Sequence, residues 1–140
     1  MTCPYAAGMR HHGPAPSAEE IEAIARAALR SLPPAFADHL GDIVLSVEEF
    51  ADEATLADLG IADPFELTGI YEGTPLTEKS VEQSGGLPDR VRLFRRPILD
   101  EWADGDDTLD HLVAHVLIHE IGHHFGLGDD DMHALEDGAE

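Results

Sequence analysis

The sequence predicts a single α+β domain in which a helix near the N-terminus and a long helix near the C-terminus flank three short strands. Two patterns carry this prediction. Apolar residues recur every three or four positions over residues 18–32 and 108–125, which is typical of helices with one buried face. They occupy every second position over residues 43–47, and the segment 90–96 begins with alternating basic and apolar residues, patterns that are typical of strands with one apolar face.

The N-terminal helix has clear start and stop signals. Ser17 and Glu20 have the spacing of a capping box, in which each side chain accepts a hydrogen bond from the other residue's backbone amide. The pair Pro33-Pro34 cannot continue a helix, so we expect the helix to occupy residues 18–32.

Between the two long helices, short elements alternate with turns. Ile43, Leu45 and Val47 give the first strand one strongly apolar face. A short helix is expected at 54–59, a turn at Asp63-Pro64 and a second strand at 67–71, a stretch rich in apolar and aromatic residues.

A glycine- and proline-rich stretch over residues 73–88 predicts a loop, and loops of about 15 residues are usually functional or mobile. The third strand follows at 90–96, contains four of the eight basic residues of the chain, and is expected to end at Pro97. An acidic turn at 104–107 leads to the C-terminal helix, which Asp107 or Thr108 can cap.

The C-terminal helix contains the sequence His119-Glu120-Ile121-Gly122-His123. Residues four apart on a helix lie on one face, so both imidazoles can bind one Zn²⁺. Glu120 is rotated by about 100° from His119 and does not compete as a ligand, because successive helical residues are spaced by that angle. It can instead act as the general base on a water that the metal activates.

A catalytic zinc needs a third protein ligand and one open position. Gly126 allows the backbone to turn away from the end of the helix, and Asp129 then lies six residues after His123. We therefore expect His119, His123 and Asp129 to bind the metal. Four other residues are alternatives for the third ligand: Asp130, Asp131, His133 and Glu136.

Three segments resemble the short bacterial zincin-like metallopeptidases, sometimes called minimal zincins. They are VLIHEIGHHFGLGD at 116–129, GIYEGTPL at 69–76 and LFRRPI at 93–98, within a resemblance that covers about residues 18–137. The first segment fits H-E-x-x-H-x-x-G-x-x-[HD], with Asp at the last position. The resemblance implies a minimal zincin-like core with a backing helix, a mixed sheet of about three to four strands and a long active-site helix. It also implies that His119, His123 and Asp129 bind zinc and that Glu120 is the base.

Composition narrows the classes of partner. Eight basic and 29 acidic residues give a formal charge of −21, which disfavours nucleic acid and anionic membranes as partners. The only cysteine, Cys3, cannot form an internal disulfide, and the N-terminus lacks the apolar segment of a secretory signal. We therefore expect a cytoplasmic and monomeric protein, with a mobile tail at 1–16 and one domain at 17–140.

The function expected from these residues is zinc-dependent hydrolysis of peptide bonds, with a peptide or protein as substrate. One alternative is a regulatory module that binds zinc and peptides without cleaving them, and another is a metal-dependent hydrolase of a non-peptide bond. Glu120 favours an enzyme, because a module that only binds has no need of a carboxylate at that position.

Three further features of the sequence need an interpretation. His111 and His115 continue the four-residue spacing toward His119, and we expect them on the flank of the helix, with His115 a candidate for orienting a ligand. The phenol of Tyr71 is a candidate for stabilising an oxyanion. The arginines of strand 90–96 either neutralise nearby carboxylates or, if this strand is the substrate-binding edge of the sheet, favour acidic peptides.

Overall fold

The computed structural model describes residues 13–34, 43–73 and 89–125. The predicted loop at 73–88, apart from Gly73, lies outside these residues, as do Gly126 and most of the predicted N-terminal tail. The described elements are, in chain order, α1 (Ala18–Arg30), β1 (Val44–Glu48), α3 (Glu53–Leu59), the 3₁₀ helix η1 (Pro64–Glu66), β2 (Gly69–Glu72), β3 (Arg90–Phe94), α4 (Arg95–Asp104) and α5 (Leu109–Phe125).

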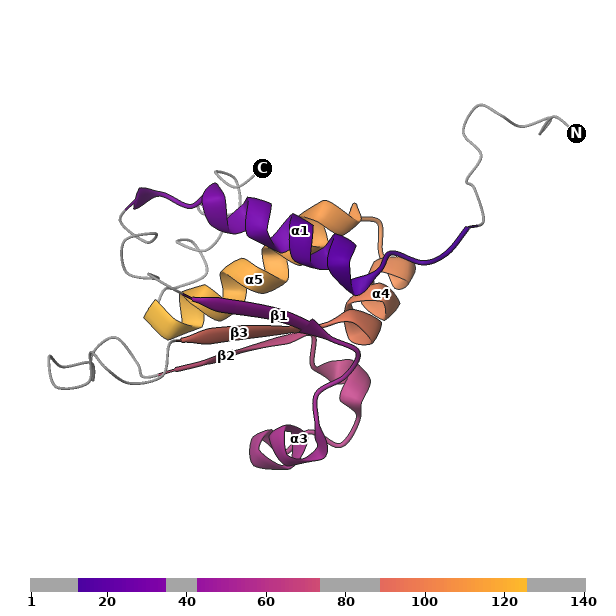
Figure 1. The fold of residues 1–140 in the computed structure, drawn as a ribbon. Helices are drawn as coiled ribbons and strands as arrows, with labels where there is room; N and C mark the ends of the chain where they lie inside the picture. Colours follow the sequence, from indigo (N-terminus) through magenta and orange to yellow (C-terminus); the bar gives the residue numbers. More distant parts are fainter. Residues whose placement is uncertain (1–12, 35–42, 74–88, 126–140) are drawn as a thin grey trace, which may run out of the picture.

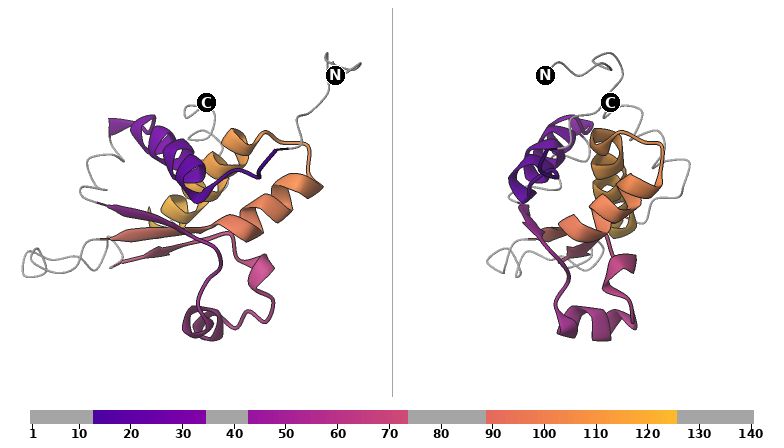
Figure 2. Two further views of the ribbon diagram at one scale, coloured as in Figure 1. Left: turned by 45° about the vertical axis from the view of Figure 1, so that its right-hand side comes forward. Right: turned by 90° about the vertical axis from the view of Figure 1, so that its right-hand side faces the viewer.

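The three strands form one mixed sheet with the order β1-β3-β2. β3 is the central strand: it pairs in parallel with β1, with Val44 opposite Arg90, and antiparallel with β2, with Tyr71 opposite Val91. Helices α1 and α5 lie side by side on one face of this sheet, and α3 lies on the other side (Figures 1 and 2). The α+β class and the mixed sheet predicted from the sequence are therefore confirmed.

The main hydrophobic core lies between the sheet and the two long helices. α1 contributes Ile21, Ala25 and Ala28, and its predicted capping box is present, with reciprocal bonds between Ser17 and Glu20 of 3.1 and 3.2 Å. α5 contributes aliphatic residues on more than one side of the helix, all of them buried: Leu112, Val113, Val116, Leu117, Ile118 and Ile121. From the sheet, Leu45, Val91 and Leu93 complete this core.

Helix α4 corrects the sequence analysis, which predicted a strand through residue 96 that Pro97 would end. The strand ends at Phe94, and α4 begins at Arg95. Pro97 is the third residue of α4, where its missing N–H removes no intrahelical hydrogen bond. Pro97 and Ile98 are buried, so the segment is held by packing.

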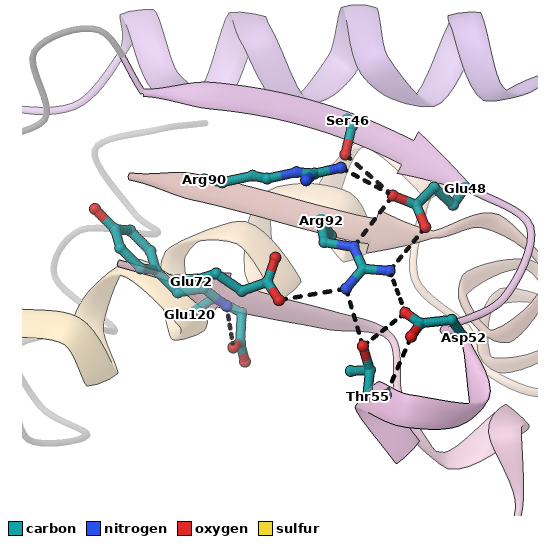
Figure 3. A network of polar contacts seen from close by, with 9 residues as sticks. Ser46, Glu48, Asp52, Thr55, Glu72, Arg90, Arg92 and Glu120 are labelled. Carbon is teal, nitrogen blue, oxygen red and sulfur yellow. Dashed lines mark hydrogen bonds and ion pairs between the residues drawn. The ribbon is translucent and has the colours of Figure 1, made fainter. Parts of the chain in front are cut away.

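The other face of the sheet is polar and is organised around Arg92, whose side chain is only 9% exposed. Its guanidinium donates to both carboxylate oxygens of Glu48, at 2.9 and 3.1 Å, and to Asp52 at 2.7 Å. Further bonds reach Thr55 at 3.1 Å and Glu72 at 3.3 Å (Figure 3). Arg92 therefore connects all three strands of the sheet to the start of α3.

Within the described residues, no helix has both the length and the apolar character that a membrane span requires.

Candidate metal and catalytic site

The predicted metal-binding histidines lie on the C-terminal half of α5. Thr108 caps this helix as expected: its hydroxyl oxygen accepts the amide of His111 at 3.1 Å. His119 and His123 lie one helical turn apart, with their ring centroids 6.2 Å apart and their planes nearly perpendicular. His119 is partly exposed and His123 is exposed, whereas Ile118 and Ile121 beside them are buried. Both imidazoles are therefore on the accessible side of a helix that the core holds firmly.

The Glu120 carboxylate contacts the neighbouring strand β2 of the sheet. One of its carboxylate oxygens, Oε1, accepts a hydrogen bond from the backbone N–H of Tyr71 in β2 at 3.2 Å (Figure 3). Burial raises the pKa of the Glu120 carboxyl, while the charge of His123 and the Tyr71 N–H partly offset this effect. A raised pKa suits a general base, whose pKa works best near the pH of the reaction.

The register of the sheet explains why the Tyr71 N–H is available to Glu120. In an antiparallel pair, alternate residues direct their backbone groups toward the partner strand. The amide of Phe94 donates to the carbonyl of Thr68 at 2.9 Å, so Thr68 is one of the residues that face β3. Tyr71 lies three positions later and faces the outer edge of β2, where Glu120 lies.

Gly69 allows β2 to come close to α5. A Cβ atom at this position would lie 3.0 Å from a methyl group of Val116 and 3.1 Å from one of Leu93, which is tighter than ordinary van der Waals contact. A larger residue would require Val116 or Leu93 to give way by a few tenths of an ångström. Gly69 precedes Tyr71 by two residues, so this close approach brings the Tyr71 amide within reach of Glu120.

The phenol of Tyr71, a candidate from the sequence for stabilising an oxyanion, contacts Asp89 in the structure. Its hydroxyl donates to Oδ2 of Asp89 at 2.8 Å, and burial and this carboxylate raise the pKa of the phenol. The contact to Glu120 is made by the backbone amide of Tyr71. Asp89 is 7% exposed and was not singled out in the sequence, because a single acidic residue before a strand matches no motif.

His115 and His111 lie on the same helical ladder as the two predicted ligands. The ring of His115 lies 4.1 Å from that of His119, centroid to centroid, so it is in a position to orient this ligand. Nδ1 of His111 lies 3.1 Å from Oδ1 of Asp107, one turn earlier, away from His119. These positions agree with the flank of the helix that the sequence predicted.

The structure contradicts the hypothesis that strand 90–96 is a substrate-binding edge. β3 is the central strand of the sheet and is paired on both sides. Arg92 is surrounded by carboxylates, and Arg90 and Arg95 pair with Glu48 and Glu49. The preference for acidic peptides that rested on this strand therefore loses its basis, and the simpler interpretation, that the arginines neutralise local carboxylates, is correct. The strand beside α5 is β2.

The predicted third metal ligand lies beyond the part of the chain that the structure describes. Asp129 falls in that segment, together with the alternatives Asp130, Asp131, His133 and Glu136. Among residues 13–34, 43–73 and 89–125, no three His, Cys, Asp or Glu side chains come together as a metal site.

The residues that are described fit a zinc ion. Two imidazoles one turn apart supply the nitrogen donors that zinc prefers, and the exposure of His123 leaves room for further ligands. A carboxylate lies on the adjacent helical position and is oriented by a backbone donor. This arrangement can bind a metal ion and move a proton beside it.

Comparison with known proteins supports the same family. No curated protein matches the chain. A family model described as zincin-like metallopeptidase matches residues 40–139, which include the whole sheet, α5 and the H-E-x-x-H sequence. Because this match covers more than half of the chain, the protein belongs to the zincin-like metallopeptidase family.

Proposed function

We propose that this protein is a zinc-dependent peptidase in which His119, His123 and Asp129 bind Zn²⁺ and Glu120 is the general base. The observation that carries the proposal is the position of Glu120, a half-buried carboxylate next to two accessible histidines and hydrogen-bonded to the neighbouring strand. Membership of the family supports zinc and peptide hydrolysis.

When bound, the metal supplies Lewis acidity, which polarises the scissile carbonyl and makes a water molecule more acidic. Glu120 takes a proton from the attacking water and delivers it to the nitrogen of the leaving amine. Because Oε1 accepts the hydrogen bond from the Tyr71 amide, the other oxygen, Oε2, takes up and releases the proton. The substrate peptide would bind along the outer edge of β2, where backbone groups turn away from β3.

The proposal is tested by separating zinc binding from catalysis. Protein purified without added metal should contain about one zinc per chain. Glu120→Gln should keep the zinc and abolish cleavage of a peptide library read by mass spectrometry, because it removes the base and leaves the ligands. His123→Ala is the matched control and should lose both.

Two results would contradict the proposal. A wild-type chain that neither contains zinc nor takes it up would remove the metal site. A zinc-loaded chain that leaves every peptide of the library intact would favour the alternative, a module that binds zinc and peptides without cleaving them.

The third ligand is tested separately. Asp129→Ala should weaken zinc binding at least about 10-fold, and more than Asp130→Ala or Asp131→Ala does. Asp129→His should restore most of the affinity, because imidazole is an equally good zinc donor. Equal losses in all three alanine variants would leave Asp129 without a special role.

A further inference from the structure

The contact between Glu120 and β2 depends on a strand that is short and lies at the edge of the sheet. β2 has four residues, and Tyr71, which provides the N–H, is the third of them. Strand ends at a sheet edge open more easily than central strands, because fewer contacts hold them. A donor in this place needs a second anchor if its position is to stay fixed.

Asp89 provides such an anchor. Its carboxylate accepts the phenolic O–H of Tyr71 at 2.8 Å, and its backbone carbonyl accepts the amide of Val44 at 2.9 Å. Asp89 is thereby tied both to the start of β1 and, through the next residue, to the start of β3. The Tyr71 side chain is therefore attached, through Asp89, to the central strand β3 and to the start of β1.

The Asp89 carboxylate is itself closely packed. Gly73, two residues after Tyr71, lies so close to it that a Cβ atom at Gly73 would overlap the carboxylate. With 7% of its surface exposed, Asp89 has little freedom to move away from the phenol. The backbone of β2 thus approaches α5 closely at Gly69 and Asp89 closely at Gly73, on either side of the amide that contacts Glu120, and the phenol of Tyr71 bonds to Asp89.

We propose that Asp89 and the phenol of Tyr71 form a positioning pair, which fixes the Tyr71 amide against Oε1 of Glu120 and so sets the orientation of the catalytic base. The hydrogen bond between the amide and Glu120 is a contact of the structure itself, whereas its effect on catalysis rests on the proposed function. Neither Asp89 nor the phenol touches the reacting atoms in this scheme. They act through the backbone of β2.

The first test measures hydrogen exchange of the Tyr71 amide by NMR, on the full chain without added zinc. Glu120→Ala should speed exchange at this amide by about 10-fold or more, because it removes the acceptor. Glu120→Gln is the matched control and should keep the protection, since its amide oxygen still accepts. If Glu120→Ala leaves the exchange rate of Tyr71 unchanged, the proposed contact is wrong.

The second test breaks the anchor and leaves the amide in place. Tyr71→Phe should speed exchange at residue 71 by about 5- to 10-fold, with a much smaller change at Val91 in the central strand. Asp89→Ala should act in the same way, and Asp89→Asn should restore most of the protection, because its carbonyl oxygen can accept the phenolic O–H. If Tyr71→Phe changes no amide locally, or if Asp89→Asn is as damaging as Asp89→Ala, the pair has no positioning role.

The third test concerns catalysis. With zinc bound, Tyr71→Phe should lower kcat about 10-fold with KM and zinc content unchanged, because a misplaced base affects the chemical step. An unchanged kcat in a variant whose amide exchanges faster would overturn the catalytic part of the proposal. A wild-type protein that binds zinc but cleaves nothing would contradict the proposed function alone, since the exchange experiments judge the positioning pair without any activity.

Discussion

The two faces of the sheet hold their neighbours by different forces. On one face, Val91 and Leu93 of β3 pack with aliphatic side chains of α1 and α5 in a continuous apolar core. On the other face, Arg92 of the same strand binds Glu48, Asp52 and Glu72 and ties α3 to the sheet (Figure 3). α3 has no buried residue, so hydrogen bonds and ion pairs attach it to the sheet. On the opposite face, apolar packing attaches α1 and α5.

This difference suggests which parts of the molecule the candidate site depends on. His119, Glu120 and His123 belong to α5, so the apolar face fixes their position. Apolar packing depends little on salt or pH, whereas charged hydrogen bonds depend on both. We therefore expect the site to tolerate changes on the α3 side that it does not tolerate on the α5 side.

The largest effect is expected from a cavity on the apolar face. Leu117 of α5 is fully buried, so Leu117→Ala should lower the free energy of unfolding by about 3 kcal/mol, through lost burial and the cavity that remains. Urea unfolding measures this loss. Leu59→Ala is the control: this side chain is 47% exposed and its removal should cost less than about 0.5 kcal/mol. A loss below about 1 kcal/mol for Leu117→Ala would mean that α5 is not anchored as described.

A smaller effect is expected from the polar face. Arg92→Met should cost about 2 kcal/mol of unfolding free energy, because three carboxylates lose their common partner while remaining partly exposed to water. Arg26→Met removes an exposed ion pair with Glu22 and should cost about 0.5 kcal/mol at most. Zinc uptake should be unchanged in both variants. Equal costs for the two would show that Arg92 is no more important than a surface arginine.

A third variant acts on the contact between α5 and β2. Gly69→Ala should cost about 1 kcal/mol, because the new methyl group must displace Val116 or Leu93. It should also separate the Tyr71 amide from Glu120, visible as faster exchange of that amide. The control is Gly60→Ala, which meets no atom within 4 Å but must adopt a φ of 69°, so it should destabilise the protein without affecting the amide of Tyr71. Unchanged exchange in Gly69→Ala would show that close approach is not needed.

The features that the sequence predicted well are local ones. The capping box of α1, the cap at Thr108 and the common helical face of His119 and His123 each depend on residues within one or two turns of each other. Such patterns follow from helix geometry alone, and they were sufficient to suggest the family.

The features that the sequence analysis missed are either non-local or ambiguous. Whether strand 90–94 is central depends on its pairing with residues more than 40 positions earlier, and the charge of Arg92 concealed the burial that marks a central strand. Pro97 is compatible both with the end of a strand and with the first turn of a helix. The contact of Glu120 with Tyr71 uses a backbone amide, which every residue except proline has, so no pattern of side chains could indicate it.

The smallest effect, and the most direct test of the difference between the two faces, is the pH dependence of the stability that the polar face contributes. The hydrogen bond from Arg92 holds the pKa of the Glu48 carboxyl below its ordinary value of 4.5, with burial acting in the opposite direction. The pKa of Asp52 is also lowered, by Thr55 and then by Arg92. As the pH falls through the ordinary pKa values of these two carboxyls, they take up protons in the unfolded chain before they do in the folded one, so unfolding becomes more favourable. The stabilisation is complete above the ordinary pKa and is lost as the pH falls through the lowered one.

Arg92→Met removes the partner and returns both carboxyls toward their ordinary pKa. The difference in stability between wild type and Arg92→Met should therefore shrink between about pH 5 and pH 3, as measured by urea unfolding at each pH. Relief of the repulsion among the 29 acidic residues affects both proteins alike and cancels in this difference. Leu117→Ala supplies the contrast, since its difference from wild type should stay constant over the same range. If the difference for Arg92→Met also stays constant, the two faces of the sheet are not held by different forces.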